Sequence, residues 1–281
     1  MHSLFKLSVK AAAKACMFKT ELGKLIYESQ KMKIRKLLTR QEQLLNLGKY
    51  EHRYKNGQLK SSEIYNEGRR IYFEWRENGN IHRIINYYED ILHGKDSIYD
   101  KDGILVGEIN YKKGKLHGKS YYRSNYIQVC YYIDGELDGP YITYNLSNEL
   151  ISHKYYINGE PHGEHLFYSD GKIIEKLVYY YGSLIHKYIL HNNGNPCEIS
   201  HYKNGRLHGR REKYYIDGNI KEICNYRRDY FHGERIKISG NVKKISNFHY
   251  GDPHGYFRKY VNEELVKEKY YEYGSLVSNH D

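Results

Sequence analysis

The sequence has little proline, cysteine, methionine or tryptophan: its 281 residues include 4 Pro, 4 Cys, 3 Met and 1 Trp. Scarce proline beside 25 glycines argues against wholesale disorder and predicts regular secondary structure with glycine at the turns. No stretch reaches the roughly 18–20 apolar residues of a membrane span, so we expect no transmembrane helix. Because no two cysteines form a CxxC pair, we expect free thiols in a reducing compartment. The cysteines are Cys16, Cys130, Cys197 and Cys224.

Aliphatic side chains are also scarce, whereas tyrosine is abundant, with 34 Tyr against 7 Phe. Without tyrosine and with glycine counted, apolar residues make up about 37% of the chain, against roughly 45–50% in ordinary globular chains counted the same way. A large dry core is therefore not expected. A thin architecture fits better, because a tyrosine ring can bury one end and keep its hydroxyl in water.

Positive charge is concentrated in the first 48 residues. The chain carries a net charge of +11, of which +7 lies in residues 1–48 and +4 in the 233 residues that follow. Acidic and basic residues alternate closely in the larger part, which is typical of a solvated face. The basic character therefore belongs mainly to the N-terminal segment.

A motif of the form Tyr-x-x-Gly-x-Leu-His-Gly recurs from residue 65 onward. The best copies are Tyr111–Gly118, Tyr156–Gly163 and Tyr202–Gly209. Ten anchors span 206 residues in nine steps of 21 to 24 residues. The anchors are Tyr65, Tyr88, Tyr111, Tyr132, Tyr156, Tyr179, Tyr202, Tyr226, Phe248 and Tyr271.

Each period contains a second turn signal midway between anchors, often Asn-Gly or Asp-Gly. Such pairs favour tight hairpin turns, because both residue types accept a left-handed backbone. The runs between turns are rich in Tyr, Ile and Val, as strands are. Tyrosine doublets such as Tyr121–Tyr122 place one ring on each face. The sequence thus predicts a mainly β fold: an elongated, single-layer antiparallel ribbon of β-hairpin repeats over residues 49–281.

The repeats resemble the MORN-repeat family in its bacterial antitoxin-like variant, over about residues 50–281. The resemblance implies an elongated β ribbon that serves as a scaffold for protein partners and, in some relatives, binds membrane lipids or neutralises a toxin. The motif gives structural turn roles to a set of glycines and histidines. They are Gly114, His117, Gly118, Gly135, Gly139, Gly159, His162, Gly163, Gly205, His208, Gly209, His232, Gly233, His254 and Gly255.

Several repeats depart from the pattern. Ile91 and Asp229 replace the glycine of the first turn, and Lys187 replaces the glycine after His186. The turns near Asn125, Asn148 and Asn262 lack glycine. We expect these repeats to be more irregular than the others.

Residues 1–48 do not share the repeat and form a separate, helix-favouring segment rich in Ala and Leu. Lys6, Lys10 and Lys14 recur at a spacing of four, a polar stripe on an otherwise apolar helix. This segment is interpreted as a cap for the first hairpin. The alternatives are an amphipathic helix on an anionic membrane, with these three lysines as membrane contacts, and a mitochondrial-type transit peptide.

The histidines of the repeat form a row, but the row does not predict a metal site. Equivalent positions lie two strands apart, about 9.6 Å, whereas two ligands of one zinc ion lie within about 4 Å of each other. We interpret the imidazoles as turn elements that bond local backbone. The row comprises His93, His117, His162, His186, His208, His232 and His254.

No motif of a hydrolase, kinase, metalloprotease or dinucleotide-binding enzyme occurs. We therefore expect no enzymatic activity, no cofactor and no metal. Basic clusters at Arg69–Arg70, Arg210–Lys213 and Arg227–Arg228 are interleaved with acids, so specific binding of nucleic acid is not expected.

The predicted function is a non-enzymatic repeat scaffold for protein–protein interaction, either as a monomer or as a homodimer. One alternative is a peripheral membrane-binding protein anchored through its N-terminal helix. Another is an antitoxin-like partner that neutralises a toxin. The expected location is intracellular and cytoplasmic, with peripheral membrane association in the first alternative.

Overall fold

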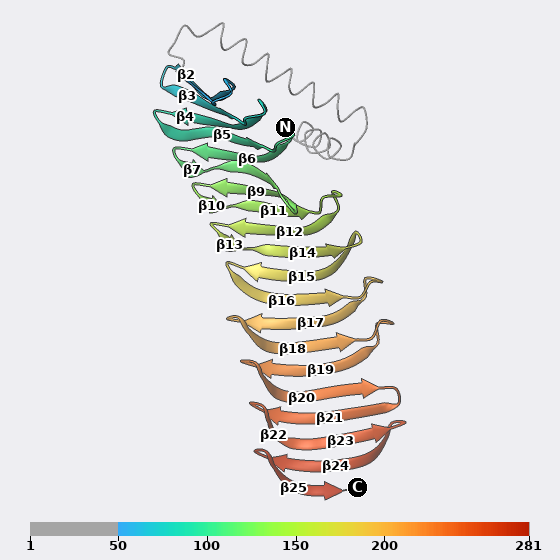
Figure 1. Ribbon diagram of the computed structural model, residues 1–281. Helices are drawn as coiled ribbons and strands as arrows, with labels where there is room; N and C mark the ends of the chain where they lie inside the picture. The colour runs from blue at the N-terminus through green and yellow to red at the C-terminus, as the bar shows by residue number, and fades with distance from the viewer. Residues whose placement is uncertain (1–49, 281) are drawn as a thin grey trace, which may run out of the picture. The chain divides into compact units, whose positions relative to one another are not determined.

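The fold was analysed in a computed structural model that describes residues 50–280. Strands make up the regular structure of these residues, and no helix occurs among them, so none of them forms a helix that could cross a membrane. The 25 strands belong to one antiparallel sheet, as the sequence predicts (Figure 1). The helical segment predicted for residues 1–48, and its boundary with the repeats, lie outside the described residues.

Contacts divide the chain into two compact units, residues 1–151 and 152–281, which we describe separately. In the first unit, leaving its two-residue strands aside, successive strands pair as antiparallel neighbours. Its strands are β1 (Tyr50–Arg53), β2 (Leu59–Asn66), β3 (Arg69–Trp75), β4 (Ile81–Tyr88), β5 (Ile91–Tyr99), β6 (Leu105–Lys112), β7 (Lys115–Leu116), β8 (Gly118–Arg123), β9 (Ile127–Ile133), β10 (Glu136–Leu137) and β11 (Gly139–Tyr144).

The second unit repeats the same succession of antiparallel neighbours. Its first strand, β12, begins two residues before the boundary. The strands are β12 (Leu150–Ile157), β13 (Glu160–Pro161), β14 (Gly163–Ser169), β15 (Lys172–Tyr180), β16 (Ser183–Leu190), β17 (Pro196–Lys203), β18 (Arg206–Tyr214), β19 (Ile220–Arg227), β20 (Tyr230–Ser239), β21 (Val242–His249), β22 (Asp252–Pro253), β23 (Gly255–Val261), β24 (Glu264–Glu272) and β25 (Ser275–His280).

The turns that follow the repeat anchors are two-residue hairpin turns with positive φ at both central residues. In the β6–β7 turn, Lys113 has φ 50° and Gly114 has φ 80°. This is the type I′ geometry, which matches the twist of the flanking strands. We call the edge of each unit that carries these turns the anchor edge. Its turns are centred on 67–68, 89–90, 113–114 and 134–135 in the first unit, and on 158–159, 181–182, 204–205, 228–229, 250–251 and 273–274 in the second.

Where the motif has its His-Gly pair, the pair is a two-residue insertion in the strand that follows the turn, whereas the strand after the turn at 67–68 keeps an unbroken register. Tyr111 pairs with Leu116 and Glu108 with Tyr121, so the four residues 117–120 lie opposite only two, and Gly118 pairs with Tyr132 on its other side. Gly118 has φ 85°, a conformation that favours glycine. Because the insertion interrupts pairing, it separates the short strand β7 from β8, and likewise β10 from β11, β13 from β14 and β22 from β23.

An asparagine or histidine of the preceding strand bonds the backbone directly after the insertion. Asn247 Nδ2 donates to the Tyr256 carbonyl at 2.8 Å, and Asn86 Nδ2 donates to the Lys95 carbonyl at 2.6 Å. His201 Nδ1 lies 2.7 Å from the Arg210 carbonyl, in the same relation nine residues apart. These bonds satisfy a carbonyl that the interrupted ladder leaves unpaired.

Most anchor-edge turns also bond to the repeat before them. The Gly114 N–H donates to the Leu92 carbonyl, and the Gly135 N–H donates to the Leu116 carbonyl, both at 2.8 Å. The opposite edge is linked as well, because Asn195 Nδ2 donates to the Ile216 carbonyl at 3.1 Å. The links are about one repeat long, so they tie neighbouring repeats to each other within each unit.

Few side chains are fully buried, as the shortage of aliphatic residues predicts. Among the described residues, the buried hydrophobic side chains are Ile64, Phe73, Ile85, Ile127, Cys130 and Cys224. Half-buried tyrosines fill much of the remaining interior, and burial raises the pKa of Tyr111, Tyr156 and Tyr226. The interior is therefore thin and polar at its margins, which suits a ring with a hydroxyl tip.

The structure corrects the frame of one repeat. Tyr87, not Tyr88, pairs with Leu92 in the way that Tyr111 pairs with Leu116. The turn is Glu89–Asp90, with φ of 49° and 60°. Ile91 therefore begins β5 and replaces no turn glycine.

Two further expectations of irregularity are wrong. Asn148 has φ 65° and occupies the place of a loop glycine, and its loop keeps the bond from the Asn145 N–H to the Glu149 carbonyl at 2.9 Å. Asn262 and Glu263, with φ of 49° and 68°, form a regular two-residue turn. Asparagine accepts the left-handed backbone well enough to replace glycine here.

Candidate functional site

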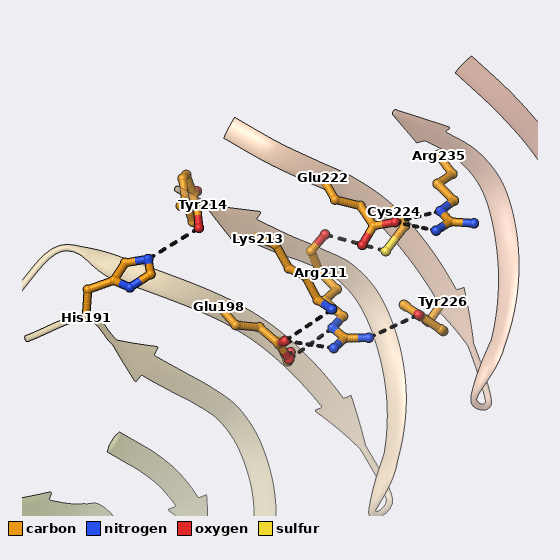
Figure 2. Close-up of polar contacts among 10 residues, drawn as sticks. His191, Glu198, Arg211, Lys213, Tyr214, Glu222, Cys224, Tyr226 and Arg235 are labelled. Carbon is orange, nitrogen blue, oxygen red and sulfur yellow. Dashed lines mark hydrogen bonds and ion pairs between the residues drawn. The ribbon is translucent and has the colours of Figure 1, made fainter. Parts of the chain in front are cut away.

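A row of ion pairs crosses the strands β17 to β20 (Figure 2). Arg211 on β18 donates from Nε and Nη2 to the two carboxylate oxygens of Glu198 on β17, at 2.9 and 2.7 Å. Arg235 on β20 contacts Glu222 on β19 at 2.7 Å in the corresponding position. The two pairs lie one repeat apart because glutamate and arginine each recur at the repeat spacing. A two-point contact between a guanidinium and a carboxylate fixes both side chains in one geometry.

Both charged groups of the Glu198–Arg211 pair have hydrogen-bond partners. Burial opposes ionisation of Glu198, but hydrogen bonds from Arg211 and Ser200 outweigh it, so the pKa of this carboxyl lies below its ordinary value. Burial also acts against the charge of Arg211, yet its bonds to Glu198 and Tyr226 raise the pKa of the guanidinium. Both groups therefore stay charged and paired across the neutral range. This arrangement holds strands together and offers no free acid or base.

Cys224 lies beside this row and is not activated. Its thiol is fully buried, lies 3.8 Å from the Arg211 carbonyl, and has a pKa raised by burial. A reactive cysteine needs the opposite, an exposed thiol with a lowered pKa. Among residues 50–280, no group of three or more His, Cys, Asp or Glu side chains is placed to hold a metal ion.

Four of the repeat histidines contact the following turn: His117, His162, His232 and His254. His162 Nδ1 accepts from the Tyr181 N–H at 3.4 Å, and the two rings lie 4.6 Å apart. For His162 and His254, the predicted bond to local backbone is therefore wrong in its partner, which lies one repeat further on. Because the sequence shows only the recurrence of histidine, it could not reveal which turn each ring reaches.

The predicted turn glycines lie at the turns and insertions where the motif places them. The first-turn glycines Gly114, Gly135, Gly159 and Gly205 all have positive φ. So do the insertion glycines, namely Gly118, Gly139, Gly163, Gly209, Gly233 and Gly255. Lys6, Lys10 and Lys14 lie outside the described residues.

The anchor edge of residues 152–281 displays tyrosine at three of its six turns. Tyr181, Tyr250 and Tyr273 are each the first central residue of a two-residue turn, and they are 55%, 40% and 71% exposed. We call them the edge tyrosines. Each packs against a histidine of the preceding repeat at 4.6 to 4.9 Å between ring centres. Their positions are therefore fixed although their outer faces are open.

A basic hollow of about 650 Å³ lies at two turns of the same edge. It is lined by residues of the turns that join β17 to β18 and β19 to β20. The lining residues are Lys203, Asn204, Arg206, His208, Arg227 and Arg228. Of the motif positions, only His208 takes part, so this cluster depends on residues outside the repeat pattern.

Comparisons with known proteins assign no family to the chain. No protein-family model matches the chain, and no curated protein matches it. A solved structure with a similar segment is the crystal structure of TcdB2-TccC3-TEV, with 9% identity and a TM-score of 0.21. That match covers 83% of this chain and 18% of the other, and at so low a TM-score it carries no argument.

The sequence contained a signal for the ion-pair row that the motif search missed. Glu175, Glu198 and Glu222 recur at steps of 23 and 24 residues, and Arg211 and Arg235 each follow a glutamate by 13 residues. A 13-residue step across a hairpin turn brings two residues to adjacent strands. The basic hollow has no such signal, because its residues come from two turns of different sequence.

Proposed function

We propose that the chain is a MORN-like repeat scaffold, a single-layer β ribbon without enzymatic activity, that binds protein partners along the anchor edge of residues 152–281. The observation that carries the proposal is the set of edge tyrosines, exposed at the tips of turns and fixed from behind by histidine. Tyrosine and arginine are the residues that dominate binding energy at protein interfaces. Arg228, at the corresponding position of an intervening turn, adds a second side chain of that kind.

The rigidity of the edge supports the same proposal. The Gly182 N–H donates to the Pro161 carbonyl at 2.9 Å, and the Gly274 N–H donates to the Pro253 carbonyl at 2.8 Å. These bonds fix the turns that present Tyr181 and Tyr273. A partner that binds a fixed side chain does not have to order it, so less free energy is lost on association.

The chemistry of the interior favours a scaffold over an enzyme. Asp96 is fully buried, yet Arg83 donates to both of its oxygens, at 2.8 and 2.6 Å. His165, also buried, is 2.7 Å from the Tyr155 carbonyl. Buried groups of this kind are occupied in holding strands together and are not available for proton transfer.

The experiment compares partner capture by two variants of the full chain. The edge variant, Tyr181→Ser/Tyr250→Ser/Tyr273→Ser, removes the edge tyrosines. The control variant, Tyr126→Ser/Leu146→Ser/Ile216→Ser, removes three exposed side chains from turns of the opposite edge, where they are 50% to 61% exposed. The proposal expects a partner that the wild type and the control retain and that the edge variant loses. Equal retention by both variants contradicts it, and loss of a dimer in the edge variant identifies the partner as a second copy.

A further inference from the structure

Most basic clusters of the repeats are neutralised by neighbouring acids. Arg70 contacts Glu63 at 3.2 Å and Asp90 at 3.1 Å, and Arg211 is paired with Glu198. The pair Arg227–Arg228 differs, because neither side chain makes an ion pair with any residue between 50 and 280. Arg227 instead lies over the Tyr250 ring, 5.3 Å from its centre.

The free arginines face a second basic turn across the basic hollow. Lys203 and Arg206 flank the turn at Asn204–Gly205, whereas Arg227 and Arg228 belong to the turn of the next repeat. Because consecutive turns stack along the anchor edge, four cationic side chains converge on one space of about 650 Å³. That volume is within the range of roughly 300–1,000 Å³ that small-molecule sites occupy.

Both sides of the hollow are joined by hydrogen bonds that hold it open in this shape. The Asp229 N–H donates to the Leu207 carbonyl at 3.0 Å, and Asp229 Oδ1 accepts from the Leu207 N–H at 2.8 Å. Asp229 Oδ2 is 3.9 Å from Arg206 Nε, a long ion pair at the rim. No carboxylate is among the described residues that line the hollow, so within residues 50–280 only this long pair offsets its positive charge.

We propose that the basic hollow binds a compact, phosphate-rich anion. Arginine matches phosphate because its planar fork presents parallel N–H donors to two oxygens, and lysine adds a point charge. His208 contributes a further ring nitrogen at the same place. Several converging cations favour a ligand with more than one phosphate group. The ligand is either a free polyphosphate-type anion or a phosphorylated lipid headgroup, which share this chemistry.

The test is isothermal titration calorimetry of the full chain with tripolyphosphate. The site variant is Lys203→Gln/Arg228→Asn, because asparagine accepts the positive φ of 53° at position 228 and keeps the turn. The matched control is Lys112→Gln/Lys113→Asn, which removes the same charge from the corresponding positions of another turn, where Lys113 has φ 50°. Tripolyphosphate should bind the wild type and the control alike, and bind the site variant at least about tenfold more weakly.

A second arm separates the two sources of phosphate. Phosphatidylcholine vesicles that carry a phosphorylated lipid are sedimented with the same three proteins. Binding of the free anion supports a soluble ligand, whereas binding only to the phosphorylated vesicles, lost in the site variant, supports a headgroup. Three results overturn the proposal: no binding in either arm, equal weakening in the site variant and the control, or binding of a single-stranded oligonucleotide without affinity for tripolyphosphate or these vesicles.

Discussion

His254 Nδ1 accepts a hydrogen bond from the backbone N–H of Tyr273 at 3.4 Å, and the two rings lie 4.8 Å apart. The residues are 19 positions apart and belong to consecutive repeats. His162 and Tyr181 have the same relation, with the same separation in sequence. In these two places, the histidine of one repeat therefore supports the turn of the next.

Replacing His254 should therefore weaken the next turn in two steps. The variant His254→Phe keeps a ring against Tyr273 but removes the acceptor, so we expect a loss of about 0.5–1.5 kcal/mol in the free energy of unfolding. The variant His254→Ala removes the ring contact as well and should lose more. Urea unfolding of the full chain measures both. A matched substitution of the exposed His280 should change little, and a loss as large as that of His254→Ala would refute the role of the ring.

Gly118 should tolerate no branched side chain. Its φ of 85° disfavours any residue with a Cβ, although the nearest side-chain atom, Asn110 Cβ, is 4.0 Å from where a Cβ would lie. Gly118→Val should therefore cost about 1–3 kcal/mol through the backbone rather than through a clash. Gly107, on β6, has no positive φ, so Gly107→Ala is the control and should cost far less. Equal melting temperatures for the two variants would show that the insertion does not need glycine.

Removing only the carboxylate of the Glu198–Arg211 pair should lower the free energy of unfolding more than removing both charges. Glu198→Gln leaves a guanidinium that is 22% exposed without its carboxylate, and we expect a loss of about 1–3 kcal/mol. The double variant Glu198→Gln/Arg211→Met should recover part of that loss, because neither charge remains. Arg210→Ala, which breaks a pair whose arginine is 53% exposed, is the control and should stay within about 1 kcal/mol of the wild type. If the losses caused by the two single substitutions simply add up in the double variant, the side chains of Glu198 and Arg211 are not coupled.

Stability should fall as the pH is lowered, with part of the fall due to His165. Burial lowers the pKa of His165 below its ordinary value of 6.5, against the effect of its bond to the Tyr155 carbonyl. The unfolded chain therefore binds a proton more readily than the folded chain. The resulting stability is present above about pH 6.5 and is lost as the pH falls toward the lower folded pKa.

His165→Gln is the variant for this measurement, because its amide can still donate to the Tyr155 carbonyl. Free energies of unfolding are compared at about pH 7.5 and about pH 5.5, on either side of the ordinary histidine pKa. The wild type should lose more stability between the two than the variant does. Parallel losses would place the pH dependence on other groups, such as His186 and His232, whose pKa values burial also lowers.

The repeat could be predicted from the sequence because its turns depend on local backbone chemistry. Asn-Gly and Asp-Gly pairs fix a hairpin turn within a few residues, so the period and the strands follow directly. The anchor of one repeat could not be predicted in the same way. The turn Glu89–Asp90 lacks glycine, and either Tyr87 or Tyr88 could be the anchor. Local rules gave no preference between them, whereas the ladder pairing of Tyr87 with Leu92 decides it.

The contacts between repeats were harder to predict than the repeats themselves. Whether His162 bonds its own turn or the next depends on how neighbouring turns stack, and no residue pattern encodes that distance. The basic hollow has the same origin, because Lys203 and Arg228 come together only when two turns are placed side by side. A sequence search can find such sites when charge recurs at the repeat spacing, as for Glu198 and Glu222, but not when it occurs once.

The central claim is that the anchor edge of residues 152–281 binds a protein partner through Tyr181, Tyr250 and Tyr273. Once a partner has been captured, its affinity for the purified wild type, the edge variant and the opposite-edge control is measured by titration. The account predicts that the control binds as the wild type does, and that the edge variant binds at least about 30-fold more weakly, as the loss of a hot-spot side chain worth about 2 kcal/mol requires. Equal affinities for the edge variant and the wild type, with both proteins folded, would contradict it.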